Sequence, residues 1–293
     1  MRQCASCRRD LPRSSYTANQ YSMGIGVSRC AACIHGHQAD IPSASESNSG
    51  RYNISSNCST TDYALNNPFA QGAFRWVAKG TYTSGPRSGQ PCVVKWFKTG
   101  AVFEADYFTL DIKAVDKALD IVNKFNELNI VDKDVKINVP GVWVSDEQYG
   151  ERAGQHILCE PFIQNYQKFN SNSGWFDDSI SWGEVMQALS HFSYHISGGQ
   201  FVLCDLQGGV YRNEVVLSDP VILSRNRDYG VTDLGPDGIS SFFSQHRCNS
   251  YCRSNWAKPS RPVQIFPPVA GTTMMRHSVS TRQSRPNRTN FYG

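Results

Sequence analysis

The 293-residue sequence contains no apolar run of membrane-spanning length, so we expect neither a membrane-embedded chain nor a membrane partner. Its start, MRQCASCRRDLPR, lacks the apolar core of a signal peptide, which predicts a location inside the cell, in the cytoplasm rather than the nucleus. There is no internal repeat, and the net charge is only +4. The composition, 40% hydrophobic and 18% charged, is typical of a globular protein with a sizeable core.

Basic charge is concentrated at the two ends of the chain. Residues 1–40 carry five arginines against two aspartates, and residues 257–293 carry six basic side chains and no acidic one. The region between them is therefore net acidic. An acidic body with basic ends argues against a dedicated nucleic-acid binder, although the ends could touch acidic partners through weak contacts.

The ten cysteines include two sets with metal-ligand spacing. In residues 1–37, two CxxC pairs are separated by 22 residues, which indicates a small zinc module whose folding depends on the metal. Its ligands would be Cys4, Cys7, Cys30 and Cys33. Disulfides are less favoured, because no signal peptide precedes them. Four unrelated cysteines at this spacing would be improbable.

Composition divides the remaining chain into three parts. Residues 38–65 are rich in Ser and Asn and indicate a linker. Residues 66–256 have the periodicity of a folded domain. Residues 257–293 are rich in Pro, Ser, Arg and Thr, so we expect a disordered tail, although its IFPP stretch could dock on the body.

Within the folded part, periodicity predicts a mixture of strands and helices. Apolar residues at three- and four-residue spacing predict an amphipathic helix over 111–128. A capping box, Ser181 to Glu184, predicts a second helix that runs to about His195. Strands are expected at 91–98, 141–144 and 155–160, and 201–206 and 214–223 are short apolar runs that each carry one aspartate.

Another set of metal-ligand residues lies near the end of the folded part. His246, Cys248 and Cys252 form His-x-Cys-x-x-x-Cys, which suits a tetrahedral zinc site that lacks one ligand. The fourth ligand must come from elsewhere in the chain. On periodicity alone His191 and His195, one helical turn apart, are equally good candidates, and a packed core histidine is the ordinary alternative for either.

Phosphate chemistry is indicated by four features in the folded part. Lys95 interrupts an apolar strand and needs an anionic partner. The glycine loop of residues 70–75 precedes it, an order common where a loop clamps nucleotide phosphates. Two further positions follow apolar strands: Asp205 together with Gln207, and Asp219. Their side chains carry oxygens suited to Mg²⁺. Each feature alone has a purely structural explanation, but their combination favours a site for phosphate chemistry.

The same residues resemble the α-kinases, a family of atypical protein kinases. The resemblance runs from about residue 66 to residue 256. It rests, in order, on GAFR, VVKWF, FN, CEPF, KFNSNSG, LSHFSY, CDLQG, SDP, TDLG and HRCNSYC. It implies an α+β, two-lobed atypical protein-kinase fold with a mostly β N-lobe and a mixed C-lobe that holds structural zinc. It also implies transfer of the γ-phosphoryl group of ATP, with Mg²⁺, to Ser or Thr hydroxyls of protein substrates.

The resemblance assigns roles by position. Lys95 would pair the α- and β-phosphates, beneath the loop that contains Gly72 and Arg75. Asp111 would pair with that lysine, although the family often has Glu there. The hinge that binds adenine would contain Glu160 and Phe162, and a basic position near the nucleotide would be Lys168.

For catalysis, the resemblance implies that Asp205 orients or deprotonates the substrate hydroxyl and that Gln207 and Asp219 hold Mg²⁺. It assigns the structural zinc to His191, His246, Cys248 and Cys252, for two zinc sites in the whole chain.

Two departures from the family pattern bear on substrate choice rather than on catalysis. A second glycine-containing loop, Gly230 to Gly235, lacks one glycine and an asparagine of the family pattern. The segment between Gly208 and Asp219 lacks the usual GVG pattern. The N-terminal module more loosely resembles the four-cysteine zinc domain of fungal Stc1-like proteins, which suggests recruitment of a protein partner. The alternatives are a non-catalytic adaptor with a kinase-like binding domain, and a small-molecule kinase.

Overall fold

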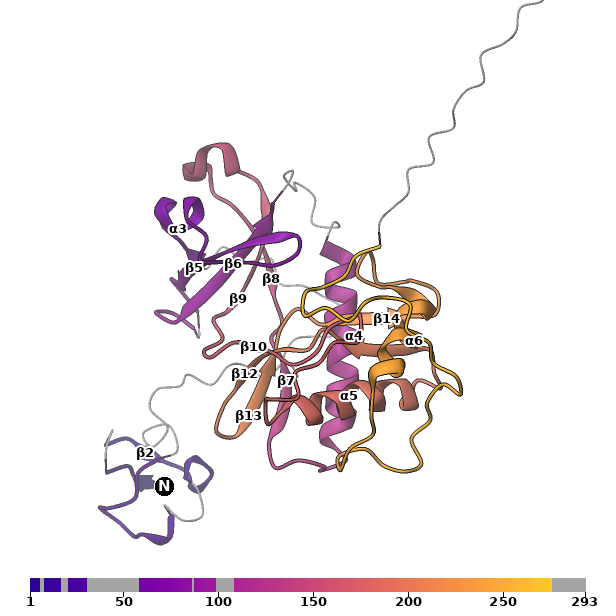
Figure 1. The fold of residues 1–293 in the computed structure, drawn as a ribbon. Coiled ribbons are helices and arrows are strands. Elements are labelled where there is room, and N and C mark those ends of the chain that lie inside the picture. Colours follow the sequence, from indigo (N-terminus) through magenta and orange to yellow (C-terminus); the bar gives the residue numbers. More distant parts are fainter. Residues whose placement is uncertain (6–7, 17–20, 31–57, 86, 99–107, 276–293) are drawn as a thin grey trace, which may run out of the picture.

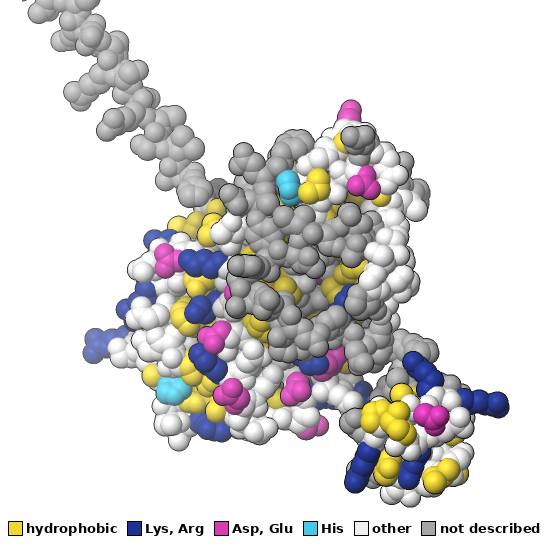
Figure 2. Space-filling view, turned by 180° about the vertical axis from the view of Figure 1, so that it is seen from behind, with side chains coloured by type: hydrophobic (Ala, Val, Ile, Leu, Met, Phe, Trp, Pro, Cys, Tyr) yellow, Lys and Arg dark blue, Asp and Glu magenta, His cyan; other side chains and the backbone are white. Residues whose placement is uncertain are grey.

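The computed structural model describes the chain except for residues 6–7, 17–20, 31–57, 86, 99–107 and 276–293. Beyond the small N-terminal module, the chain forms two lobes, one built around a single sheet and one that mixes sheets and helices (Figure 1). Among the described residues, no helix combines the length and apolar character needed to span a membrane. On the face in Figure 2, basic and acidic side chains are interspersed over the body.

The N-terminal lobe is an antiparallel sheet of six strands in the order β3-β5-β6-β9-β8, with β4 paired to β5. The short helix α3, Asp62–Asn66, precedes β4. The strands are β3 Cys58–Ser59, β4 Ala70–Gln71, β5 Arg75–Tyr82, β6 Pro91–Phe97, β8 Gly141–Val144 and β9 His156–Pro161.

The central strand β6 carries the chemistry of this lobe. Its interior is buried on both faces, as expected for a strand between two others. Lys95 lies within this buried run at 6% exposure, so it is a core lysine rather than an edge lysine with its head in solvent. Such a position requires anionic partners.

The C-terminal lobe contains a four-stranded sheet, β10-β12-β13-β7, and a two-stranded ribbon, β11-β14. Three helices pack around them (Figure 1). The elements are α4 Thr109–Asn126, β7 Asp134–Ile137, β10 Gln167–Lys168, α5 Gly183–Ile196, β11 Phe201–Cys204, β12 Gln207–Val210, β13 Glu214–Leu217, β14 Val221–Ser224 and α6 Gly235–Gln245.

Helix α4 agrees with the helix predicted over 111–128. It buries Val115, Ala118, Val122 and Phe125 at three- and four-residue spacing against the core that also contains α5. Burial of such a face, rather than propensity, provides most of the stability of a helix of this length. The strands predicted at 91–98, 141–144 and 155–160 also form.

Helix α5 begins later than the predicted capping box implies, so that prediction was wrong in its detail. Trp182, not Ser181, precedes the helix, and it makes no side-chain capping hydrogen bond. Packing fixes the start instead. A Cβ on Gly183 would lie 2.1 Å from the carbonyl oxygen of Asp177, so the two backbones meet where only glycine fits.

The N-terminal module contains two short strands, β1 Arg2–Gln3 and β2 Asp10–Leu11, and the 3-10 turn Arg13–Ser15. Cys4 and Cys30 are buried together with Tyr16, and the backbone N–H of Cys30 donates to Cys4 Sγ at 3.2 Å. Half of the predicted ligand set is therefore brought together. Cys7 and Cys33 lie outside the described residues.

The chain after Trp256 differs from the tail expected over 257–293. Residues 257–275 lie along the C-terminal lobe, and Phe266 and Met275 pack against the core between α6 and the β11-β14 ribbon. We call residues 263–275 the C-terminal strap. The expected docking of IFPP is therefore observed, whereas residues 276–293 lie outside the described range.

Candidate active site and metal centre

The two aspartates predicted for catalysis occupy equivalent switch points in the fold. β11 pairs with β14 and β12 pairs with β13, so the chain changes sheet once between β11 and β12 and again between β13 and β14. Asp205 stands at the first change with φ 59°, and Asp219 at the second with φ 51°. Asp tolerates this left-handed conformation better than most residues. The backbone N–H of Ser218 donates to Gln207 O at 2.9 Å, which holds the two switch points side by side.

Lys95 reaches from the N-terminal lobe to this place. Its Nζ forms ion pairs with Glu160 and with Asp219, the latter at 2.5 Å, and donates to Ser218 Oγ at 3.3 Å. Ser218 Oγ in turn donates to Glu160 Oε1 at 2.9 Å. The side chains of Lys95 and Glu160 are 8% and 4% exposed, whereas that of Asp219 is 41% exposed. A buried pair is thus joined to a carboxylate that solvent can reach.

The pKa values of this triad follow from burial and from mutual charge. Burial by itself lowers the pKa of Lys95, but the carboxylates of Asp219 and Glu160 outweigh it and raise that pKa. Burial raises the pKa of Glu160 although Lys95 opposes it. Burial also acts to raise the pKa of Asp219, but Lys95 brings it below its usual value. Lys95 is therefore a stable ammonium, and Asp219 is the ionised partner.

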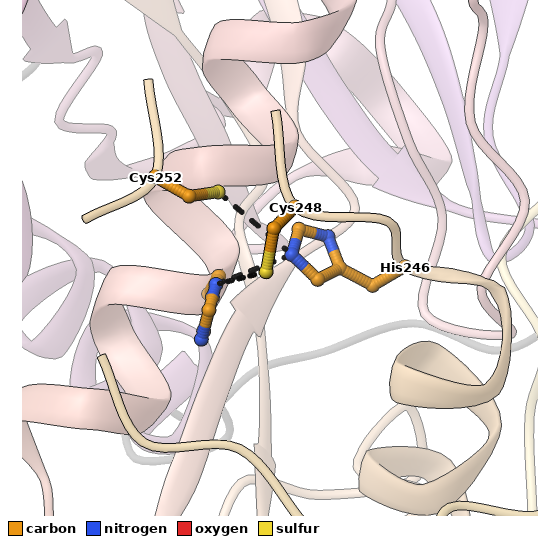
Figure 3. Close-up of side chains that lie close together, drawn as sticks. His246, Cys248 and Cys252 are labelled. Atoms are coloured by element: carbon orange, nitrogen blue, oxygen red, sulfur yellow. Dashed lines mark hydrogen bonds between the residues drawn. The ribbon is translucent and has the colours of Figure 1, made fainter. Parts of the chain in front are cut away.

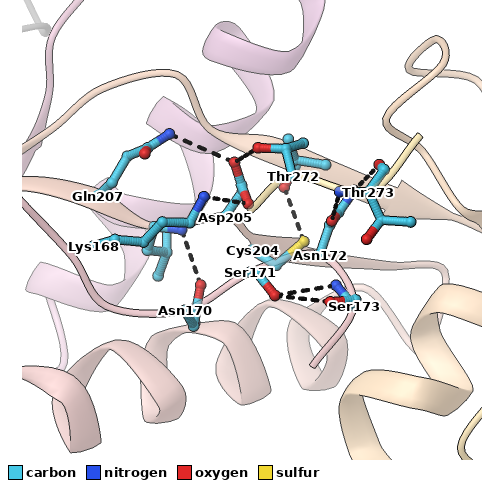
Figure 4. Close-up of polar contacts among 12 residues, drawn as sticks. Lys168, Asn170, Ser171, Asn172, Ser173, Cys204, Asp205, Gln207, Thr272 and Thr273 are labelled. Carbon is cyan, nitrogen blue, oxygen red and sulfur yellow. Dashed lines mark hydrogen bonds and ion pairs between the residues drawn. The ribbon is translucent and has the colours of Figure 1, made fainter. Parts of the chain in front are cut away.

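Asp205 is the centre of a second set of polar contacts (Figure 4). Its Oδ1 pairs with Lys168 Nζ at 2.9 Å, and its Oδ2 accepts from Thr272 Oγ1 at 2.7 Å and from Gln207 Nε2 at 3.5 Å. Asp205 is 1% exposed. Burial raises the pKa of its carboxyl, while Lys168 and the hydrogen bond from Thr272 act to lower it. The arrangement suits a base that is held ionised mainly by one neighbouring ammonium.

The predicted pairing of Asp111 with Lys95 was wrong. Asp111, in the first turn of α4, pairs with Arg75 at 2.8 Å, and the lysine finds its partner in Glu160. The sheet geometry explains this. Val93 is opposite Glu160 and Lys95 is opposite Leu158, so Lys95 and Glu160 are diagonal neighbours on one face of adjacent strands.

The predicted hinge and glycine loop are well formed, but their roles remain predictions. Phe162 N donates to Pro91 O at 3.1 Å, so its backbone donor is already used within the sheet. Gly72 lies in the tight turn between β4 and β5, where its N–H donates to Arg75 O at 2.9 Å. No atom of the described residues lies within 4 Å of a Cβ built on Gly72, so these residues leave open space beside the turn.

A cluster of potential metal ligands forms in the C-terminal lobe, where α5 meets the segment after α6 (Figure 3). The ligand atoms of His191, His246, Cys248 and Cys252 all lie within 4.8 Å of one another. His246 Nε2 is 3.2 Å from His191 Nδ1, and two sulfur-to-nitrogen distances are 3.9 Å. Donors around a tetrahedral zinc ion are separated by about 3.3–3.8 Å. The donor set therefore fits zinc in both chemistry and spacing.

The histidines of the cluster are oriented for this purpose. His191 Nε2 is 3.1 Å from Ala257 O, an arrangement that leaves Nδ1 free to face the cluster. Burial, reinforced by the proximity of His191, lowers the pKa of His246 to about 3, so its ring is neutral at physiological pH. The rival histidine, His195, is excluded by geometry: its Nδ1 accepts from Ala257 N at 3.2 Å and its ring stacks on Trp256.

Sequence reasoning missed several residues that position the site. Asn170 Oδ1 accepts from Leu206 N at 2.9 Å and its Nδ2 donates to Ser190 Oγ at 3.0 Å, which fixes the segment that follows Asp205. Asp233 is fully buried in the loop of residues 230–235, and it accepts hydrogen bonds from the backbone N–H groups of Ser224 and Gly235. The asparagine-rich KFNSNSG stretch was the signal for Asn170, whereas the contact of Thr272 with Asp205 had none.

This combination defines a kinase-type fold: a β-rich lobe supplies a buried lysine, and a mixed lobe supplies two aspartates at sheet switch points. A model of the α-kinase family matches residues 70–252, and the chain belongs to this family.

The comparisons with individual proteins agree. The chain is 30% identical to alpha-protein kinase vwkA of Dictyostelium discoideum over 193 residues, which cover 64% of this chain and 30% of that protein. It therefore spans less than a third of this relative.

Solved structures show the same fold. The crystal structure of the α-kinase domain of myosin heavy chain kinase A in complex with AMP superposes with a TM-score of 0.56 at 24% identity, over 67% of this chain and 88% of that one. An inactive form of that domain complexed with ATP superposes with a TM-score of 0.51 at 25% identity, over 64% of this chain and 85% of that one.

Proposed function

We propose that this protein is an ATP-dependent serine/threonine protein kinase of the α-kinase type. The observation that carries the proposal is the convergence of Lys95, from one lobe, with Asp205 and Asp219, from the other. Family membership supports it, as does the ATP bound to the related domain. Phosphoryl transfer depends mainly on positioning and charge neutralisation, which such a convergence of charges supplies.

In this mechanism Lys95 holds the phosphates of ATP. Its ammonium stays charged because Glu160 and Asp219 raise its pKa, and its buried stem fixes the position of that charge. Asp205 orients the acceptor hydroxyl and takes its proton as the oxygen attacks the γ-phosphorus. Lys168 counteracts the rise that burial causes in the pKa of Asp205 and so favours its ionised form. A bound nucleotide would draw Lys95 toward its phosphates, which releases Asp219.

We assign the magnesium site to Gln207 and Asp219. These residues offer amide and carboxylate oxygens, the donors that Mg²⁺ prefers, and Ser218 connects them through the backbone. The exposed side chain of Asp219 leaves its carboxylate accessible to a hydrated cation. When bound, the cation would neutralise charge that develops on the phosphates.

We further propose that zinc occupies the cluster of His191, His246, Cys248 and Cys252. Four protein ligands leave no open position, so the metal would be structural and would tie α5 to the segment after α6. A second zinc is proposed for the N-terminal module, on the basis of its cysteine spacing and the contact of Cys30 with Cys4. That module would recruit a protein partner.

A phosphate-transfer assay tests the kinase proposal against the adaptor alternative. The full chain, its Asp205→Ala variant and an Asp120→Ala control are incubated with γ-labelled ATP, Mg²⁺ and a mixed Ser/Thr peptide library. Asp120 is a surface residue on α4, about half exposed, away from the site. We expect label with the wild type and the control, and a loss of at least about 100-fold in Asp205→Ala. Equal labelling by all three, or none by any, would favour the adaptor.

A further inference from the structure

An open cavity lies against one face of the sheet in the N-terminal lobe. Its volume is about 540 Å³, including the mouth that opens to solvent, which is typical of a small-molecule site. The sheet contributes Val94 and Trp96 from β6, Trp143 from β8 and Ile157 from β9. The remaining sides come from residues in and next to α3 and from the 3-10 turn η4, Glu147–Arg152, with its flanks.

The cavity is separate from the proposed nucleotide site, because the two lie on opposite faces of the sheet. Side chains alternate between the faces of a strand. Val94 and Trp96 line the cavity, so Lys95 between them points to the other face, where it meets Glu160 and Asp219. A molecule in the cavity would therefore contact β6 without touching the lysine.

The apolar walls contain polar groups that have no partner. Gln155 is only 5% exposed, and Trp96 and Trp143 are also buried. Among the residues that the structure describes, neither the amide of Gln155 nor the indole N–H of either tryptophan makes a hydrogen bond, although buried groups of these kinds usually do. These groups supply more donors than acceptors.

The backbone holds the amide of Gln155 in place. Its N–H donates to Arg152 O at 3.0 Å, and its carbonyl oxygen accepts from Ser145 N at 3.0 Å. Both partners also line the cavity. The unpaired amide is thus carried by a fixed segment of backbone, as expected of a preformed site rather than of a surface side chain.

A guanidinium completes the set of donors. Arg152 Cζ lies 5.9 Å from the ring centroid of Trp96, and its Nη1 donates to Asn66 Oδ1 at 3.3 Å. Arg152 forms no ion pair with a carboxylate of the described residues, so most of its N–H donors remain available. Asp146 also lines the cavity, but its side chain is exposed and solvent screens its charge.

We propose that this cavity binds a small planar aromatic molecule that carries a carboxylate. The aromatic and aliphatic walls enclose the ring system, and the carboxylate accepts hydrogen bonds from Arg152 and from the neighbouring buried donors. A cationic ligand is disfavoured because the guanidinium lacks a counter-charge. A wholly apolar ligand is disfavoured because it would leave the buried donors without a partner.

Binding of naphthoate to the full chain tests the site without any measurement of enzyme activity. Saturation-transfer NMR titrations compare naphthoate with the neutral naphthylmethanol and the cationic naphthylmethylamine. We expect naphthoate to bind with a Kd of about 1 mM or lower, and at least about fivefold more tightly than the other two molecules. No binding of naphthoate, equal affinity for all three molecules, or preference for the amine would overturn the proposal.

Substitutions locate the bound molecule. Arg152→Met should weaken the binding of naphthoate by at least about tenfold and leave that of naphthylmethanol within about twofold. Gln155→Leu, which removes the amide at similar volume, should also weaken naphthoate. Arg212→Met, in the exposed turn between β12 and β13, is the matched control and should retain full affinity. Circular dichroism and urea unfolding verify that the variants fold. Unchanged affinity in both cavity variants would show that naphthoate binds elsewhere.

ATP separates this cavity from the proposed nucleotide site. Naphthoate should remain bound when ATP and Mg²⁺ are added at saturating concentration, because the two molecules would lie on opposite faces of β6. Complete and competitive displacement by ATP would place naphthoate in the nucleotide site and refute the assignment to the cavity.

Discussion

Replacement of Lys95 by methionine should destabilise the protein in a way that depends on pH. Methionine keeps most of the apolar stem of the lysine, so the main loss is the charge that Glu160 and Asp219 share. Asp219 is half exposed and remains hydrated, so its loss of a partner has a small effect. Glu160, at 4% exposure, becomes an unpaired buried carboxylate, a situation that typically destabilises by about 3–5 kcal/mol.

Protonation of Glu160 sets an upper limit to this loss. For a carboxyl with an ordinary pKa of about 4.3, the free-energy cost of protonation is about 3.7 kcal/mol at pH 7 and about 1 kcal/mol at pH 5. Burial already raises the pKa of Glu160, and removal of Lys95 raises it further. The variant therefore loses more unfolding free energy as pH rises from the pKa of Glu160 in the unfolded chain to its higher pKa in the folded variant. We expect a decrease in unfolding free energy of about 3 kcal/mol at pH 7 and about 1 kcal/mol at pH 5.

Urea unfolding followed by tryptophan fluorescence at both pH values measures these differences. Lys124→Met, at an exposed ion pair on α4, is the matched control and should stay within about 0.5 kcal/mol of the wild type. The double variant Lys95→Met with Glu160→Gln should recover at least about half of the loss at pH 7. An equal loss at both pH values, or no recovery in the double variant, would refute this account of Lys95.

Three further predictions concern the other parts of the site. Because Lys168 opposes the rise that burial causes in the pKa of Asp205, the Lys168→Met variant should move the acid limb of the kcat/KM profile to higher pH, and an unmoved limb contradicts the pairing. Zinc analysis should find about two ions per chain in the wild type and in His195→Ala but about one in Cys248→Ser, and equal content in both variants contradicts the proposed ligand set. Asp111→Asn should keep the rate of phosphate transfer within about threefold of the wild type, because the partner of Asp111 is Arg75 of β5 rather than Lys95. A loss beyond about 100-fold would instead support the pairing of Asp111 with Lys95 that the sequence predicted.

The sequence predicted the parts of this protein that depend on local pattern. Apolar periodicity identified α4 because a helix buries every third or fourth residue, and the apolar runs around Lys95 and Asp205 identified their strands. The His-x-Cys-x-x-x-Cys motif identified three members of the candidate metal cluster because side chains on one short segment are necessarily close together.

Tertiary structure alone decided the partners. Glu160 replaces Asp111 as the partner of Lys95 because strand register, which single-chain periodicity does not encode, makes it a diagonal neighbour. The choice of His191 over His195 depends on which face of α5 meets the segment after α6, and the two histidines are indistinguishable by spacing. Thr272 and Asp205 are 67 residues apart in sequence, and only the packing of the strap on the lobe brings them together. Local composition made residues 257–275 look like a tail, and only their packing on the lobe placed a hydroxyl at the carboxylate that we propose as the catalytic base.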